Sequence, residues 1–308
     1  MEHNHFKAFA ASLFARYETR MWRKEKDAFL QHCKTEFAKL GYNDTEIMVR
    51  EDKTGGFTSK NLLVGPADAD VLITAHYDTP GRSGYFMALN PIGGSVFSMI
   101  LLGFLLFLLG FLRGFLQNYY FDIAVNLLPL VLVAPMFIKN KHNRTDNTSG
   151  VLGVFRMAEL AANDPVLREK CAFVLFDHEE IGLVGSRAFA KWRRTHCPGK
   201  AQGTVINLDC IGNGDVLSVM TRKDHEGWHE MAAFLQSEGY YVMKGRGSIL
   251  ATSDHAPFAG GISLLFQKRS LLGPLYIPHL HTGKDKTCDL GQIERLCDSL
   301  RKYIGERP

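Results

Sequence analysis

The 308-residue chain lacks several features that would assign it to a simple class of protein. It has no internal repeats, no low-complexity linker and no run of basic residues interleaved with aromatic ones. Its formal net charge of +4 is too small to indicate binding to nucleic acid, so we expect no nucleic-acid partner. The first residues carry charges and no uninterrupted apolar stretch before a small-residue cleavage site, and we therefore expect no signal peptide.

Cysteine is also scarce, and no two cysteines form a C-x-x-C pair. The six cysteines are Cys33, Cys171, Cys197, Cys210, Cys288 and Cys297. Scattered cysteines without a secretory signal are typical of reduced thiols in a cytoplasmic setting. Because their number is even, counting alone leaves a disulfide framework open.

Charged residues are absent from residues 84–112, whose centre reads SVFSMILLGFLLFLLGFL. A second apolar segment, IAVNLLPLVLVAPMFI, covers residues 123–138. A membrane-spanning helix needs about 20 apolar residues, which the second segment reaches when Tyr119, Tyr120 and Phe121 extend it as an interfacial aromatic belt. We therefore predict an inserted transmembrane helical hairpin. The alternative is a buried hairpin in a large soluble core, but core helices normally keep a polar stripe, which the first segment lacks.

The rest of the chain reads as a soluble α/β protein, and its hydrophobic content of 46% allows a sizeable core. Apolar runs predict strands at residues 61–64, 71–75, 171–176, 204–209 and 262–266. Amphipathic patterns predict helices within residues 5–40, 148–163, 182–194, 226–239 and 290–304. This alternation predicts an α/β fold with a mostly parallel mixed sheet and helices on both faces. We divide the chain into N-terminal helices with the first part of the domain (1–84), the inserted hairpin (85–138) and the remainder of the domain (139–308).

Polar side chains follow the predicted strands, where chemistry collects in sheets of this kind. The candidates are His76, Asp78, Asp146, Glu179, Glu180, Asp209 and His281. Each is weak alone, because an Asp before a helix is often an N-cap and two adjacent glutamates can form a solvent-screened turn. Together, unpaired acids would repel one another, and bound divalent cations would supply the missing charge. Imidazole and carboxylate ligands fit zinc, with cobalt or manganese as alternatives. We expect the side chain of Cys210 to point away from this cluster.

The motifs AHYDT, TDNTSG, DHEEIGLVGS, NLDCIGNG, SDHAPF and HTGKDKT occur in an order that resembles the co-catalytic zinc exopeptidases of clan MH. This group includes bacterial leucyl aminopeptidases, glutamate carboxypeptidase and glutaminyl cyclase. The resemblance covers residues 61–78 and then residue 146 to the C-terminus, so the N-terminal helices and the apolar insert lie outside it.

The resemblance implies a set of ligands for two zinc ions. His76 and Asp209 resemble ligands of one ion, and Glu180 and His281 resemble ligands of the other. Asp146 is similar to the carboxylate that bridges the two. This assignment gives the charge of Glu180 to a metal ion and so relieves its repulsion with Glu179.

The resemblance also implies two catalytic roles without metal ligation. Glu179 resembles the general base that takes a proton from the metal-bridging water. Asp78 is similar to the acid that orients the metal-bound His76.

Other side chains near the motifs could compete for these roles. His178 should point away from the site, and His279 could replace His281, although Thr282 and Asp285 match the family pattern at His281. His255 resembles a position near the substrate rather than a ligand. Tyr276 could stabilise an oxyanion, although an ordinary packed tyrosine is the commoner case.

These features together predict a membrane-anchored di-zinc exopeptidase that acts on peptides, with an aminopeptidase as the first choice. A carboxypeptidase, a dipeptidase or another amidohydrolase of the same fold is the alternative. A glutaminyl cyclase fits less well, because cyclases of this group use one metal ion. A catalytically idle membrane scaffold or receptor is the alternative from another class.

The position of the hairpin predicts where the domain lies. The hairpin joins the chain near Asp78 and Asp146, so the site should lie close to the bilayer and could take hydrophobic peptides or peptide ends leaving it. Its domain side carries Arg82, Lys139, Lys141 and Arg144, whereas the turn between its helices carries only Arg113. Because basic residues favour the cytoplasmic side, we predict a multi-pass cell-membrane protein with a cytoplasmic catalytic domain. The sequence does not indicate an oligomeric state.

Overall fold

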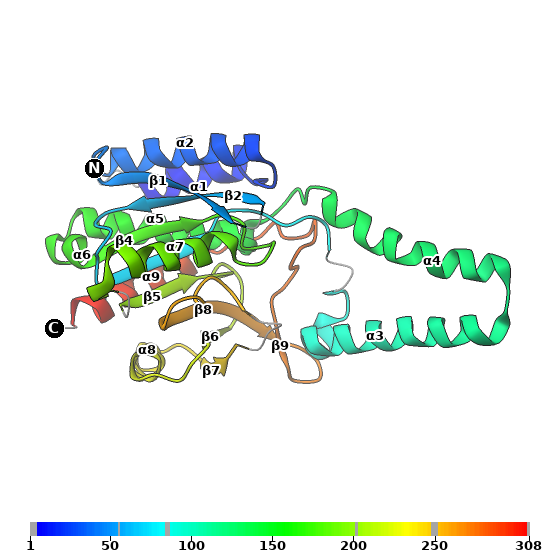
Figure 1. Ribbon diagram of the computed structural model, residues 1–308. Coiled ribbons are helices and arrows are strands. Elements are labelled where there is room, and N and C mark those ends of the chain that lie inside the picture. Colours follow the sequence, from blue (N-terminus) through cyan, green and yellow to red (C-terminus); the bar gives the residue numbers. More distant parts are fainter. Residues whose placement is uncertain (1–4, 55, 84–86, 201–202, 248–251, 307–308) are drawn as a thin grey trace.

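A mixed β-sheet lies at the centre of the α/β domain, and helices cover both of its faces (Figure 1). The computed structural model describes residues 5–54, 56–83, 87–200, 203–247 and 252–306. The strands are β1 (Ile47–Thr54), β2 (Phe57–Val64), β3 (Val71–His76), β4 (Cys171–Phe176), β5 (Thr204–Leu208), β6 (Val216–Thr221), β7 (Val242–Arg246), β8 (Gly260–Arg269) and β9 (Leu275–Tyr276). Their order is β1-β2-β4-β3-β5-β8-β6-β7, with β9 paired to β8.

The four strands at the centre of the sheet, β4, β3, β5 and β8, run parallel to one another. β2 and β6 flank them in the antiparallel direction. β3 and β4 are buried along their whole length, as expected for parallel strands with both faces covered. The predicted α/β fold with a mixed sheet is thus confirmed, whereas β1, β6 and β7 were not predicted from the sequence.

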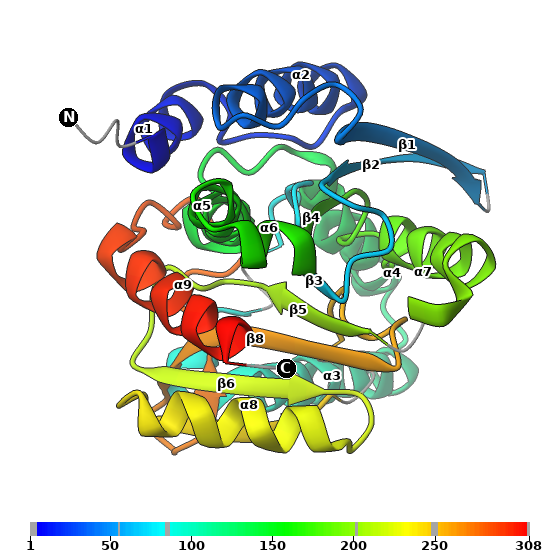
Figure 2. The ribbon, with the colours of Figure 1, turned by 90° about the vertical axis from the view of Figure 1, so that its left-hand side faces the viewer.

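Figure 2 shows the two helical layers on either side of the strands. One layer holds α1 (His5–Arg16), α2 (Arg23–Lys39), α5 (Ser149–Ala162), α6 (Pro165–Lys170), α8 (Glu226–Ser237) and α9 (Leu290–Gly305). The other face is covered by α7 (Val184–His196), whose Phe189 packs on Phe176 and belongs to a smaller core cluster with Phe258. The helical region predicted within residues 5–40 forms the two helices α1 and α2, and they contribute to the larger core.

The apolar insert forms two antiparallel helices that project away from the domain (Figure 1). They are α3 (Asn90–Leu116) and α4 (Tyr119–Val133), the latter continued by a 3₁₀ turn, Ala134–Phe137. No residue of α4 is buried, and the large apolar side chains along α3 are exposed, so the alternative of a buried core hairpin is wrong. Both helices are long and apolar enough to cross a membrane. The predicted start of the insert, at residue 85, lies outside the described residues.

The base of the hairpin is attached to the α/β domain on both sides. Gly81 and Lys139 form an antiparallel bridge between the segments that lead into and out of it. On the other side, the backbone N–H of Leu271 donates to the carbonyl of Pro91 at 2.9 Å, in the loop between β8 and β9. The hairpin is therefore fixed to the same edge of the domain where the parallel strands end.

Candidate metal centre and active site

The five predicted metal ligands come together at the carboxyl edge of the parallel strands. His76 ends β3, Glu180 follows β4 and Asp209 follows β5. Asp146 lies in the turn Arg144–Thr148 before α5, and His281 lies in the loop before α9. Because β3, β4 and β5 are neighbours in the sheet, their ends are adjacent, and the two loops complete the cluster.

Asp146 is the centre of this cluster. Its Oδ1 is 3.3 Å from Nε2 of His76, and its Oδ2 is 2.9 Å from Nε2 of His281. Asp209 Oδ1 lies 3.8 Å from the same nitrogen of His76, and Glu180 Oε2 lies 3.4 Å from that of His281. The structure thus brings the two assigned pairs close together around Asp146, and their division between two metal ions stays a prediction. The N-cap interpretation of Asp146 is wrong, because its carboxylate contacts both imidazoles.

The spacing of these donor atoms fits divalent cations. Zinc binds nitrogen and oxygen at about 2.0–2.2 Å, which places neighbouring donors on a tetrahedral ion roughly 3.4 Å apart. Asp146 belongs to two groups whose donor atoms lie within 4.8 Å of one another, one with His76 and Glu180 and one with Asp209 and Cys210. A candidate metal site is therefore present, with the Asp146 carboxylate shared between two groups of donors. These groups cross the pairs assigned from the sequence, because His76 is grouped with Glu180, and Asp209 is grouped with neither histidine.

The charges of the cluster also call for cations. Burial alone would lower the pKa of His76, but the nearby Glu179 and contacts with Asp146 and Asp209 raise it well above its usual value. Burial, reinforced by Asp146, raises the pKa of Glu180 to about 8. The pKa of His281 is also raised, to about 9, by Glu180 and Asp146, whereas the pKa of Asp209 is lowered by His76. Positive charge beside these carboxylates therefore stabilises the cluster, and bound cations would supply the same charge.

Glu179 and Glu180 are adjacent in sequence but occupy different surroundings. Glu180 contacts His281, whereas Glu179 lines a separate cavity together with His255. Burial, with the charges of Glu180 and Asp254 added, raises the pKa of Glu179 well above its usual value. Glu179 therefore lies beside Glu180 in the chain but faces a different cavity, and its role as general base stays a prediction.

Asp78 holds both glutamates in position. Its two carboxylate oxygens accept the backbone N–H groups of Glu179 at 3.0 Å and Glu180 at 3.2 Å. The predicted contact with His76 is longer, at 3.6 Å between Oδ1 and Nδ1, while the Asp78 backbone carbonyl lies 3.2 Å from the same nitrogen. Asp78 therefore orients His76 mainly through its backbone and places the glutamates through its side chain.

Two serines that sequence reasoning missed contact the candidate ligands. Ser83 Oγ lies 2.8 Å from Nδ1 of His281, and Ser253 Oγ donates to Oδ2 of Asp209 at 2.6 Å. Ser253 belongs to the SDHAPF motif, so the family resemblance could have placed it near the site. Ser83 had none, because the segment before the hairpin lies outside the family pattern.

Arg20 is a second missed feature, a fully buried cation between α1 and α2. Its Nε donates to the carbonyl of Tyr77, and its Nη1 donates to Thr148 Oγ1 at 3.0 Å. Burial lowers its pKa to about 10, against the raising effect of Asp78 and other acids, so it remains charged at neutral pH. The N-terminal helices therefore contribute a permanent positive charge behind the acidic cluster.

Near Asp146, the side chain of Cys210 does not point away from the cluster as expected, and Asp254 is a buried acid that was not singled out from the sequence. Cys210 lies beyond the end of β5 with φ 55°, so strand alternation does not apply, and its sulfur is near Asp146 and Asp209 instead of pointing away. Burial and the charge of Asp209 raise the pKa of this thiol well above its usual value. Asp254 was missed: it is fully buried, and burial raises its pKa to about 7 against the lowering effects of His76 and Ser186.

The remaining histidines do not compete for the ligand positions. His279 is exposed, and His281 makes the contacts with the cluster. His178 lies beside Asp177 and the ring of Phe57. His255 is buried among the residues that line the Glu179 cavity.

All six cysteines are free, so the alternative of a disulfide framework is wrong.

An apolar cavity of about 750 Å³ connects the cluster with the base of the hairpin. Asp78, Glu180 and His281 line it on one side, and Met136 and Phe137 from the end of the second apolar segment line it on the other. The candidate active site therefore opens toward the apolar insert.

Comparison with known proteins identifies the family to which this site belongs. The sequence profile of Peptidase family M28 matches residues 139–303, more than half of the chain. The chain belongs to Peptidase family M28. This membership supports a metallopeptidase-type hydrolase, and it agrees with the resemblance to the co-catalytic zinc exopeptidases. No curated protein matches the chain.

Solved structures of this group share the fold. The Legionella pneumophila LapA aminopeptidase superposes with a TM-score of 0.61 at 16% identity, over 98% of this chain and 68% of the other. The Porphyromonas gingivalis glutaminyl cyclase gives a TM-score of 0.63 at 16% identity, over 98% and 96% of the two chains. The Bacteroides thetaiotaomicron glutaminyl cyclase gives 0.61 at 12% identity, over 99% and 98%. At these identities the superpositions show a common fold and leave the reaction open.

Proposed function

We propose that the protein is a membrane-anchored exopeptidase with two divalent metal ions, zinc by preference, and that it acts as an aminopeptidase. The observation that carries this is the pairing of His76 with Asp209 and of Glu180 with His281 through one shared carboxylate, Asp146. Such ions, when bound, lower the pKa of water toward neutrality and polarise a carbonyl oxygen. Cobalt or manganese fit the same ligands.

The side chains of the chain perform the remaining tasks. Glu179 accepts the proton of the attacking water and returns it to the leaving amine, as its position outside the ligand set favours. Asp78 fixes the backbone of Glu179 and Glu180, so the base keeps a constant distance from the ligands. The apolar cavity that leads to Met136 and Phe137 favours a hydrophobic substrate residue that arrives from the bilayer side.

A glutaminyl cyclase is the second candidate, because such enzymes are among the structural neighbours. The full set of five ligands supports the hydrolase, since it suits two ions. A catalytically idle scaffold or receptor remains the alternative from another class, and the retention of every ligand and of Glu179 argues against it.

Metal analysis and substrate turnover together test this proposal. The purified protein in detergent should hold two metal ions per chain and should cleave peptides with a free N-terminus, but not their N-acetylated counterparts. Preference for N-blocked peptides would assign a carboxypeptidase, and cyclisation of N-terminal glutamine without peptide cleavage would assign the cyclase. Metal binding without turnover of any of these substrates would contradict an enzymatic role.

A further inference from the structure

A groove separate from the apolar cavity begins at Glu179. It consists of two cavities of about 560 Å³ and 240 Å³ that share Arg194, Arg222, Ala256 and Pro257 among their lining residues. Glu179 and His255 line the larger cavity at its inner end. Helix α7 lines one wall, and residues 252 and 255–259, which precede β8, line the other. We call these two cavities together the basic groove.

Besides the buried Arg193, four cations line the basic groove: Arg187, Arg194, Arg222 and Lys223. All four are exposed, and among the described residues no carboxylate forms an ion pair with any of them. Arg194 donates only to the carbonyl of Pro257, at a long 3.5 Å. The acid next to Lys223, Asp224, contacts His229 at 2.6 Å instead.

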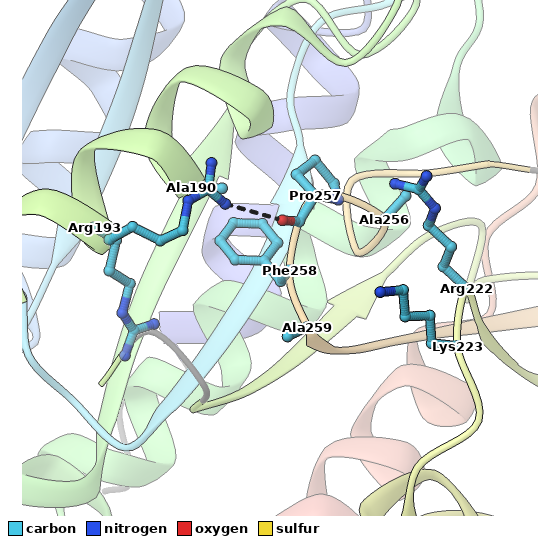
Figure 3. Close-up of a pocket in the computed structure, with 9 residues that line it drawn as sticks. Ala190, Arg193, Arg222, Lys223, Ala256, Pro257, Phe258 and Ala259 are labelled. Atoms are coloured by element: carbon cyan, nitrogen blue, oxygen red, sulfur yellow. Dashed lines mark hydrogen bonds between the residues drawn. The ribbon is translucent and has the colours of Figure 1, made fainter. Parts of the chain in front are cut away.

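The arrangement of the groove shows which cations are free to bind a ligand. In Figure 3, Arg222 and Lys223 lie across Ala256 and Pro257 from helix α7. Arg193, also drawn there, is buried and donates to the carbonyl of Ala69, so it serves the fold. Cations on both walls of a concave site produce a local positive potential that attracts anions more strongly than scattered surface charges do.

We propose that the basic groove binds a carboxylate on the leaving part of the peptide substrate, so that the enzyme prefers short peptides with a free C-terminus or an acidic side chain. This inference rests on the proposed peptidase function, because Glu179 marks the reacting end of the groove. Arginine side chains bind carboxylates through two parallel hydrogen bonds, which favours this group over a neutral chain end.

The spacing of the arginines sets the length of peptide that fits. Arg187 and Arg194 are seven residues apart on α7, which corresponds to about 10.5 Å along a helix. An extended peptide covers that distance in about three residues. A terminal carboxylate close to the scissile bond therefore meets Arg187, and one about three residues further on meets Arg194 and Arg222.

Matched peptides test the inference. Peptides with a free N-terminus and two to six residues would be assayed as C-terminal acids and as C-terminal amides, and amides containing Glu or Gln would be compared in the same way. We expect KM to be roughly 10-fold lower for the charged member of a pair, and the difference to shrink at high salt because the cations are exposed. A gain with C-terminal acids identifies the terminal carboxylate as the ligand, and a gain with Glu identifies the side chain. Equal KM values across all pairs would overturn the inference while leaving the peptidase function intact.

Variants separate a binding role from a structural one. Arg194→Met and Arg222→Met should raise KM for the acids and remove the acid-over-amide preference. Arg222→Glu should reverse it in favour of peptides that end in an aminoethyl amide, a change that misfolding would not produce. The matched control Arg16→Met, on α1 and away from the groove, should keep the preference of the parent protein.

Calorimetric titration of the same peptides gives an answer that does not depend on turnover. Tighter binding of acids than of amides would support the groove even in a protein that cleaves no peptide, in which case only the proposed function fails. Equal affinities of the two would reject the groove.

Discussion

Ser83 Oγ lies 2.8 Å from Nδ1 of His281. This contact joins the segment that leads into the hairpin to a candidate metal ligand. Gly81, two residues earlier, forms the bridge with Lys139 that closes the hairpin base. The base of the hairpin and the candidate metal centre therefore share one short stretch of chain, and a change in one should be measurable in the other.

The first prediction concerns this serine. Ser83→Ala removes the group that fixes the ring of His281, and loss of such a partner typically weakens metal affinity by about 10–100-fold. Titration with a competing chelator measures the affinity of each ion. Ser237→Ala is the control, because Ser237 lies at the end of α8 and donates only to the carbonyl of Phe234. Unchanged affinity in Ser83→Ala would show that the contact does not support a metal ligand.

A second prediction concerns Gly81. A Cβ at this position would lie 1.7 Å from the carbonyl oxygen of Met136, so Gly81→Ala has to displace the end of the hairpin. Overpacking of this kind costs about 1–3 kcal/mol, and the melting temperature in detergent should fall by several degrees. Gly199→Ala, where a Cβ meets no atom within 4 Å, should melt like the parent protein. Equal melting temperatures for the two variants would mean that the hairpin base is not held as described.

The third prediction separates the two adjacent glutamates. Glu179→Gln should lower kcat by roughly 10²–10⁴-fold while the protein keeps its metal ions, because a general base is lost but no ligand. Glu180→Gln should lose or weaken one ion, because its carboxylate contacts His281. Neither substitution removes the backbone N–H groups that donate hydrogen bonds to the Asp78 carboxylate, so the fold around the site should persist. Equal metal loss in the two variants would contradict the division of roles.

Much of the fold could be predicted because the central strands contain short, mostly apolar and buried runs with polar residues at one end. CAFVLF and the strand ending at His76 follow this pattern along their whole length. β1 and β7 were missed because they lie at the edges of the sheet and expose most of their side chains. β6 was missed because it follows β5 without an intervening helix, and the prediction assumed that strands and helices alternate.

The cluster of candidate ligands could be predicted because family motifs carry these residues. The side chains that contact the candidate ligands depend on contacts across long stretches of sequence. Arg20 and Ser83 are 128 and 198 residues from the partners Thr148 and His281. The position of Cys210 depends on a left-handed backbone conformation at a non-glycine residue. The periodicity of apolar residues in the sequence indicates neither these long-range contacts nor the backbone conformation of Cys210.

The last prediction concerns the orientation of the hairpin in the membrane. Because a hairpin returns the chain to the side it left, the N-terminal helices and the metal centre must share one face. Arg113 near the tip contacts Asp122 at 3.1 Å, and Lys139 at the base pairs with Glu25. The preference for the cytoplasmic side depends on the number of Lys and Arg residues and not on net charge. These two ion pairs therefore do not change the prediction that the base of the hairpin faces the cytoplasm.

Single cysteines at Gln117, between the two helices, and at Lys284, in the exposed loop after His281, test this orientation. In a background without the six native cysteines, an impermeant thiol reagent applied to intact cells should label position 117, and it should label position 284 only after the cells are permeabilised. The two sites serve as controls for each other, because the reagent and the fold are the same in both variants. Labelling of position 284 but not 117 in intact cells would place the catalytic domain outside. Recovery of the whole protein in the soluble fraction without detergent would rule out the membrane hairpin, and the exposed apolar side chains of α3 and α4 would then have to be covered by another protein surface.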